Sequence, residues 1–104
     1  MSTRKLKEVL ENELGPFTFG RFLRAARVSK DLSQTQMAKL LNISKSTLCD
    51  IEKERQRVSP ALASKIAKKS GFSESVAVEA AIRDQLRHSK LYLEAHIRPL
   101  KKAA

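Results

Sequence analysis

Short polar side chains gather between residues 44 and 57, where they offer hydrogen-bond donors and acceptors on one side of a short helix. The outward positions of a helix that begins after Ser44 are Lys45, Ser46, Cys49, Asp50 and Lys53. An ammonium group donates hydrogen bonds, a carboxylate accepts them and a hydroxyl does both. This chemistry suits the recognition of a polar partner.

The sequence lacks the combinations of residues that catalysis or metal binding would need. It shows no Ser/His/Asp or Cys/His arrangement and no paired carboxylates, and its three glycines form no phosphate-binding loop. A single cysteine, Cys49, excludes an intramolecular disulfide and a zinc knuckle, and His88 and His96 lie far from it in the sequence. We therefore expect no enzyme activity, no metal and no cofactor.

The charge balance points to a polyanionic partner. Lys and Arg number 21 against 11 Asp and Glu, which gives a net charge of +10 in 104 residues. Nucleic acid is the first candidate and an anionic membrane the second. No apolar run approaches the ~20 residues of a membrane span, and the first residues lack the apolar centre of a signal peptide. We expect a cytoplasmic protein that binds no membrane.

Apolar residues at helical spacing predict an all-α fold. The expected helices lie near residues 1–14, 18–29, 33–41, 44–53, 59–71 and 73–88. Serines at 33, 44, 59 and 73 are suited to cap helix starts, and Gly71 and Asn42 to end helices. With no Trp and 5% aromatic residues, the core should be aliphatic. Three parts follow: an N-terminal amphipathic helix (1–16), a helical domain (17–72) and a C-terminal segment (73–104).

The hydrophobic period changes over residues 90–98. Leu91, Leu93, Ala95 and Ile97 alternate with polar residues, which favours a β-strand over an extension of the sixth helix. A lone strand leaves its backbone groups unpaired, so its natural partner is the same strand of a second copy across a two-fold axis. We therefore expect a dimerising strand that uses Leu91, Leu93 and Ile97, with a longer helix as the alternative.

The helices at 33–41 and 44–53, joined by a tight turn, have the spacing of a helix-turn-helix. The matching features are Leu32-Ser33-Gln34 at the first helix, Ala38 at the helix crossing, Ile43-Ser44 at the turn and Ile51-Glu52 at the end of the second helix. With these features the sequence resembles the phage-repressor family, also called Cro-like or xenobiotic-response-element proteins. The resemblance covers roughly residues 18–71. It implies a lambda-repressor-like five-helix DNA-binding domain, flanked here by an extra N-terminal helix and the C-terminal helix and strand.

The resemblance implies that the helix at 44–53 enters the major groove of DNA, where bulky apolar groups would clash. By position, the residues that it assigns to base contacts are Lys45, Ser46, Thr47 and Asp50. Lys45 can donate to guanine, and Asp50 can accept from a cytosine or adenine amino group. Alternatively, Asp50 only holds Lys45 or Lys53 in place.

Phosphate contacts and a structural ion pair complete the implied site. The phosphate-contacting residues are Gln34, Lys53, Arg55, Gln56 and Arg57. The alternative for Gln34 is a simple neighbour of the helix cap. In the family, the positions of Arg27 and Glu52 form a partly buried ion pair. Asp31 and Glu54 replace frequent family glycines, and a positive φ at Glu54 would cost about 1 kcal/mol.

Two functions fit these expectations. The first is a sequence-specific DNA-binding transcriptional regulator, a repressor that binds a pseudo-palindromic operator on double-stranded DNA as a homodimer. The second is an antitoxin that neutralises a toxin protein and autoregulates its operon, with residues 1–16 and 73–104 as candidate toxin contacts. A toxin reading frame beside the gene would distinguish the two.

Overall fold

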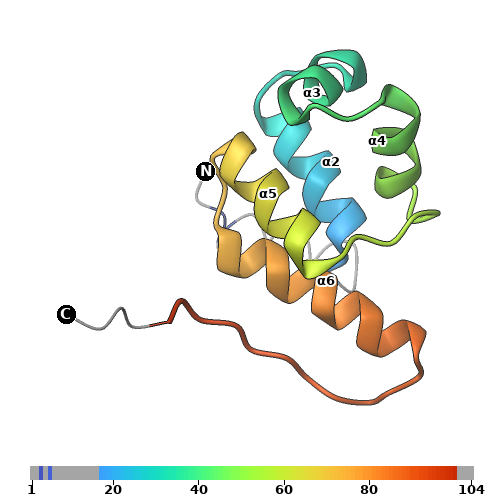
Figure 1. The fold of residues 1–104 in the computed structure, drawn as a ribbon, viewed down its shortest axis with the longest axis vertical. Coiled ribbons are helices and arrows are strands. Elements are labelled where there is room, and N and C mark those ends of the chain that lie inside the picture. Colours follow the sequence, from blue (N-terminus) through green and yellow to red (C-terminus); the bar gives the residue numbers. More distant parts are fainter. Residues whose placement is uncertain (1–2, 4, 6–16, 101–104) are drawn as a thin grey trace.

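The computed structural model describes residues 3, 5 and 17–100 of the chain. These residues form five helices: α2 (Phe19–Ser29), α3 (Gln34–Leu41), α4 (Lys45–Glu52), α5 (Pro60–Ser70) and α6 (Glu74–His88) (Figure 1). The predicted all-α class is confirmed. The helix expected over residues 1–16 lies outside the described residues, apart from Thr3 and Lys5.

Hydroxyl side chains start every one of these five helices. Thr18 caps α2, and Ser33, Ser44, Ser59 and Ser73 cap α3 to α6; each hydroxyl accepts a hydrogen bond from the backbone N–H three residues on. Ser33 and Gln36 form a reciprocal capping box, in which the Gln36 side chain accepts from the Ser33 N–H. Because these caps satisfy N–H groups that have no partner within the helix, the starts lie where the sequence predicts them.

Each described helix is followed by a residue with left-handed backbone. Only one of these residues, Gly71, is a glycine, with φ of 77°. The other four are Asp31, Asn42, Glu54 and Lys90, with φ between 56° and 61°. A left-handed backbone costs a residue with a Cβ roughly 1–2 kcal/mol, less for Asn and Asp. The positive φ expected at Glu54 is therefore present.

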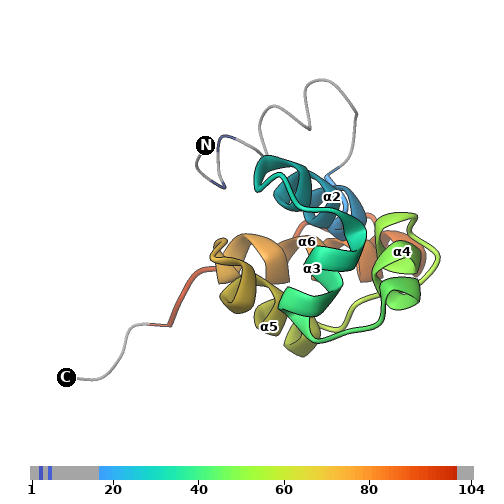
Figure 2. The same ribbon diagram turned by 90° about the horizontal axis from the view of Figure 1, so that it is seen from above.

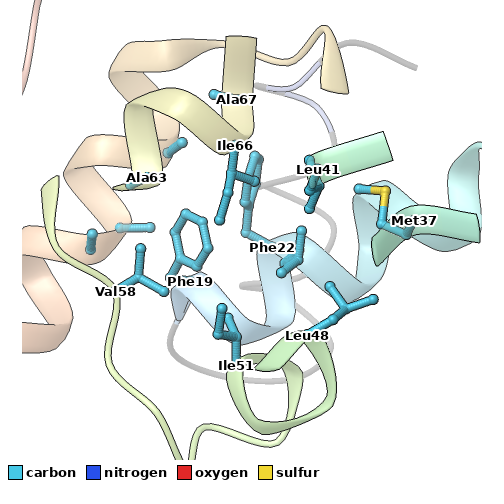
Figure 3. Packing of buried hydrophobic residues seen from close by; sticks show 14 of the residues in the cluster. Phe19, Phe22, Met37, Leu41, Leu48, Ile51, Val58, Ala63, Ile66 and Ala67 are labelled. Atoms are coloured by element: carbon cyan, nitrogen blue, oxygen red, sulfur yellow. The ribbon is translucent and has the colours of Figure 1, made fainter. Parts of the chain in front are cut away.

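The core lies where α2 meets the other helices, and it is not purely aliphatic (Figure 3). Phe22 is fully buried, and its ring meets those of Phe17, Phe19 and Phe72 at centroid distances of 5.5–5.9 Å. Leu23, Met37, Leu48, Ile51 and Ile66 fill the space around them. The four phenylalanines thus lie in or against the core, because large rings bury much apolar area per side chain, whereas Tyr92 is exposed.

The segment after α6 differs from both alternatives that the sequence offered. Residues 91–100 have no regular secondary structure and run back along α6 (Figure 1). The longer helix is wrong because Lys90 takes a φ of 57°, and the N–H groups of Lys90 and Leu91 bond the carbonyls of Arg87 and Leu86. The predicted strand is not formed in the single chain, where residues 91–100 have no regular secondary structure and no other segment of the described part pairs with them; its pairing with a second copy stays a prediction.

No helix in the described part of the chain is long and apolar enough to cross a membrane.

Candidate nucleic-acid interface

A tight turn sets the angle between α3 and α4. Asn42 takes a left-handed φ of 56°, and the N–H of Ile43 donates to the carbonyl of Ala38 at 3.0 Å. The Ile43 side chain packs against the core, and Ala38 is buried, so a small residue stands inside this corner. Figure 2 shows the result, with α4 at the edge of the bundle beside α3.

The first turn of α4 presents polar groups outward. Lys45 and Ser46 are both exposed. Thr47 is half-buried, and its hydroxyl accepts a 2.8 Å hydrogen bond from Ser44, whose own oxygen caps the helix. Of the residues predicted to contact bases, Lys45 and Ser46 are therefore the two most available, whereas Thr47 helps to fix the start of the helix.

Asp50 lies beside the loop that follows α4. Its backbone carbonyl accepts hydrogen bonds from the N–H groups of Arg55 and Gln56 at 2.8 and 3.2 Å. Its carboxylate lies 3.8 Å from the Arg55 guanidinium, and neither side chain is buried. The carboxylate thus faces Arg55 rather than the Lys45 or Lys53 of the sequence-based alternative. An exposed pair of this kind contributes about 0–1 kcal/mol, so Asp50 can exchange it for another partner.

The loop after α4 places four predicted phosphate-contacting residues on the surface. Lys53, Arg55, Gln56 and Arg57 are all exposed. Gln34, the fifth, is half-buried at the start of α3, and its amide nitrogen donates to Glu52 Oε1 at 3.4 Å. One amide hydrogen of Gln34 therefore points toward the protein, which leaves the second for another acceptor.

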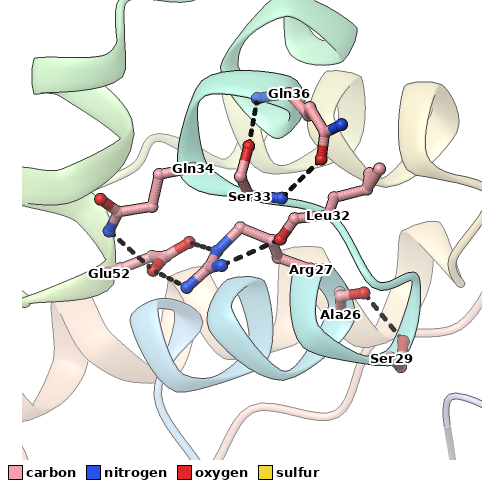
Figure 4. A network of polar contacts seen from close by, with 8 residues as sticks. All are labelled: Ala26, Arg27, Ser29, Leu32, Ser33, Gln34, Gln36 and Glu52. Atoms are coloured by element: carbon pink, nitrogen blue, oxygen red, sulfur yellow. Dashed lines mark hydrogen bonds and ion pairs between the residues drawn. The ribbon is translucent and has the colours of Figure 1, made fainter.

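Arg27 and Glu52 form an ion pair that joins α2 to the end of α4 (Figure 4). Arg27 Nε and Nη2 lie 2.8 and 3.1 Å from the two Glu52 oxygens, and Nη1 donates to the carbonyl of Leu32 at 3.0 Å. The hydrogen bond that Arg27 donates to the Glu52 carboxylate raises the pKa of Arg27 above its usual value, against the opposing effect of burial. With Gln34 included, this network ties α2, α3 and α4 together and fixes the orientation of α4.

Three further supports of α4 and its surroundings were not predicted from the sequence. A Cβ at Gly20 would lie 2.5 Å from the Ile51 carbonyl oxygen, so only glycine allows this approach of α2 to α4. Lys69 donates to the Leu41 carbonyl at the end of α3. Asp84 of α6 accepts from the Phe19 N–H at the start of α2, and burial raises the pKa of its carboxyl. Only Gly20 carried a signal, as an isolated glycine inside a helical pattern.

Comparisons with known proteins bear on these same elements. A helix-turn-helix family model, HTH_3, matches residues 23–75. Among solved structures, the chain is similar to an HTH_3 family transcriptional regulator from Vibrio cholerae, with 31% identity and a TM-score of 0.53. That match covers 65% of this chain but only 38% of the other, so this chain corresponds to less than half of that regulator. No curated protein matches the sequence.

Proposed function

The chain belongs to the HTH_3 family of helix-turn-helix proteins, and on that premise we propose that it is a transcriptional regulator that reads a specific DNA sequence through α4. The observation that carries the proposal is the exposed, polar first turn of α4, Lys45 and Ser46, followed by an exposed basic loop. The net charge of +10 supplies the attraction to a polyanion.

In this function the two parts of the interface do different work. The first turn of α4 enters the major groove, where Lys45 donates to guanine, Ser46 and Thr47 contact neighbouring bases and Asp50 accepts from an exocyclic amino group. Lys53, Arg55, Gln56 and Arg57 contact the adjacent phosphates, together with the second amide hydrogen of Gln34. The phosphate contacts position the protein, and the base contacts select the sequence.

The regulator acts as a homodimer on a pseudo-palindromic operator. Two copies of α4 then read successive major grooves about 34 Å apart, and the bound dimer represses by covering a promoter. Large apolar residues exposed near the C-terminus, among them Leu91 and Leu93, support a protein contact in this part of the chain. Ile97, the third predicted dimer residue, is half-buried.

Selection of bound duplexes from a random pool, followed by substitution of α4, tests the function. Lys45→Ala combined with Ser46→Ala should reduce the ratio of operator to non-specific affinity, by about 1–3 kcal/mol for each good base contact that the substitutions remove. Lys65→Ala removes an exposed lysine outside α3 and α4 and serves as the control for the change in net charge. An unchanged ratio in the double variant, or a pool that yields no preferred sequence, would refute base reading by α4.

The basic loop is tested by the salt dependence of binding. Arg55→Ala should weaken binding to all duplexes alike and lower the slope of log affinity against log salt by about one unit, because one phosphate is no longer neutralised by the protein. A change in the preferred sequence, with the slope intact, would instead assign Arg55 to base recognition or to the positioning of Asp50.

An antitoxin is the second candidate function, and one observation favours it. The described residues after α6 expose Leu91, Tyr92, Leu93 and Leu100, which suit a protein partner better than DNA. An adjacent reading frame whose product arrests growth, and is neutralised by this protein when both are expressed, would support this function. Neutralisation by a variant with Lys45→Ala and Ser46→Ala would separate it from operator binding.

A further inference from the structure

The segment after α6 holds on to its own chain through few interactions. We call residues 90–100 the C-terminal arm; it runs back along α6 (Figure 1). Arg83 Nε on α6 donates to the carbonyl of Ala95 at 3.0 Å, and Ile97 is half-buried. The other large apolar residues of the arm stay uncovered, including Tyr92, whose side chain is fully exposed. Beyond the turn at Lys90 and Leu91, the arm is thus attached to α6 through its second half.

The surface that receives the arm is built into α6 and the end of α5. A groove of about 670 Å³ is lined by Ser64, Ser73, Glu74, Ser75 and Val78 on one side and by residues 97–100 on the other. Arg83 is held in place by Glu79 at 2.7 Å, and Glu79 also lies 3.9 Å from His96. The end of the arm therefore forms one wall of this groove, with α6 and α5 on the other side.

The connection between α6 and the arm is strained. Lys90 has a φ of 57°, a left-handed conformation that disfavours residues with a Cβ. The turn is closed by the N–H groups of Lys90 and Leu91, which donate to Arg87 and Leu86. Opening this turn releases the strain at Lys90 and breaks only these local bonds at the end of a helix.

From these three observations we propose that two copies exchange their C-terminal arms. The arm of each copy lies on α6 of the other, where it forms the same wall of the groove that it forms here on its own α6. The hydrogen bond from Arg83 to Ala95 and the approach of His96 to Glu79 are then kept between chains, which is why exchange costs little. The two connections cross beside each other, and Leu91, Tyr92 and Leu93 of both copies cover one another there.

The second copy is the partner that we choose because the α6 residues that the arm contacts, Arg83 and Glu79, are present on every copy of this chain. The arm is also long enough. Eleven extended residues span roughly 35 Å at about 3.3 Å each, comparable with the 39 × 35 × 24 Å extents of the molecule. The proposal rests on the homodimer of the proposed function and names the surface that forms it.

Cross-linking between chains tests the exchange directly. In a Cys49→Ser background, one population carries Val78→Cys and the other Ile97→Cys, and the two are refolded together and treated with a short bismaleimide. Exchange predicts a cross-linked heterodimer, identified by mass spectrometry of the joined peptides. Pairing Val78→Cys with Val28→Cys, an exposed position on α2, controls for random collision. A chain that carries both Val78→Cys and Ile97→Cys should give dimers; a cross-link confined to single chains overturns the proposal.

Two substitutions at Lys90 should move the dimer in opposite directions. Lys90→Pro cannot adopt the positive φ and removes the N–H that closes the turn, so it should tighten dimerisation on the order of tenfold. Lys90→Gly accepts the left-handed turn without strain and should weaken it several-fold. Sedimentation over a concentration series measures both. A chain that is monomeric throughout, or a dimer indifferent to both changes, overturns the exchange.

Binding to a DNA duplex with one half-site distinguishes a failure of the arm exchange from a failure of the proposed DNA recognition. Single-site binding uses one copy of α4 and should be unchanged by either Lys90 variant. If half-site binding is specific but no interchain cross-link forms, the arm proposal fails while DNA reading stands. If no specific DNA is found but arms exchange, the reverse holds.

Discussion

The helical bundle (residues 17–88) and the C-terminal arm differ in how far their apolar side chains are buried and in how their charged side chains are paired. In the described bundle the large apolar side chains form one core, and Glu52, although buried, is paired with Arg27. No buried side-chain nitrogen or oxygen among the described residues lacks a hydrogen-bond partner. The arm instead exposes Leu91, Tyr92 and Leu93, and its carboxylate Glu94 lies in solvent beside His96.

This difference suggests different roles for the two regions, with the bundle as the support of α4 and the arm as a segment that can pack against a partner. The bundle is complete within one chain, so it can hold α4 in a fixed orientation for groove recognition. In the exchanged dimer that we propose, the exposed apolar residues of the arm are covered by a partner, so the packing of the arm would depend on protein concentration. Substitutions at matched residues of the two regions, taken from the largest expected effect to the smallest, test this contrast.

The largest contrast should come from two carboxylates that each have a basic neighbour. Glu52→Ala leaves Arg27 without its partner in a site where the Glu52 side chain is 3% exposed, and it should cost about 3–5 kcal/mol of unfolding free energy. Glu94→Ala removes a side chain that is 83% exposed and should change stability by less than about 0.5 kcal/mol. Urea unfolding of dilute protein measures both; equal losses would contradict the division between bundle and arm.

Two leucines extend the comparison to apolar burial. Leu48 is 0% exposed inside the bundle, so Leu48→Ala should cost about 2–5 kcal/mol, because apolar burial is reduced and a cavity remains. Leu93 is 64% exposed, so Leu93→Ala should leave the unfolding free energy of dilute protein nearly unchanged while weakening self-association. A large drop in monomer stability from Leu93→Ala would show that the arm belongs to the folded core.

Glycine at two left-handed positions should stabilise the chain slightly. Glu54→Gly and Lys90→Gly each remove the strain of a positive φ, by up to about 1 kcal/mol. The gain should be larger at Glu54, because its turn is held between α4 and α2, than at Lys90, where the helix end can fray. Thermal unfolding gives the two shifts. A destabilised Glu54→Gly would mean that the Glu54 side chain makes an interaction that outweighs its strain.

The smallest expected effect is the pH dependence of the free energy of unfolding. Two carboxylates of α6, Asp84 and Glu74, should contribute to it with opposite signs. Burial raises the pKa of Asp84 above its ordinary 3.8, despite the Phe19 N–H and Arg87. As pH rises from the ordinary pKa of Asp84 through its raised pKa, the folded state keeps the proton longer than the unfolded state does. The free energy of unfolding therefore falls over this pH range. Asp84→Asn should remove that fall, because its amide oxygen still accepts from Phe19.

Glu74 on the groove side of α6 should behave in the opposite way. Hydrogen bonds from Ser64 and then Lys68 lower the pKa of Glu74. Stability from this group is therefore present above its ordinary pKa and disappears as pH falls through the lowered value. Glu74→Gln should flatten that acid-induced decrease, weakly because the group is exposed. Denaturation of both variants at a series of acidic pH values checks the signs, and like signs would contradict the assignment.

Local patterns predicted most of the bundle and the residues of the candidate site. The serine caps and the helical spacing of apolar residues indicated the helix starts, since these signals act within a few residues. The short polar residues of α4 likewise marked the outward face at Lys45 and Ser46. For the phosphate-contacting loop, the resemblance supplied the positions, and the structure places all four of its residues on the surface.

The sequence could not predict which distant segments meet. Its period of two over residues 90–98 indicated a strand paired with a second copy, whereas in the single chain residues 91–100 have no regular secondary structure and no neighbouring strand in the described part. Two contacts likewise depend on the approach of separate helices. Asp84 of α6 bonds the start of α2, and Gly20 of α2 lies against the end of α4. The alternative to a base contact placed Asp50 beside Lys45 or Lys53, yet the fold of the next loop brings Arg55 to it.

The amino-acid sequence by itself determined which segments are helical, where they begin and which polar residues α4 carries, because capping and amphipathic spacing are local properties. Only the tertiary structure decided how α4 is braced and where the arm goes. Those outcomes depend on the packing of helices that lie far apart in the chain. A glycine, a carboxylate or a left-handed turn affects them only when the folded chain brings the contacting helix next to it.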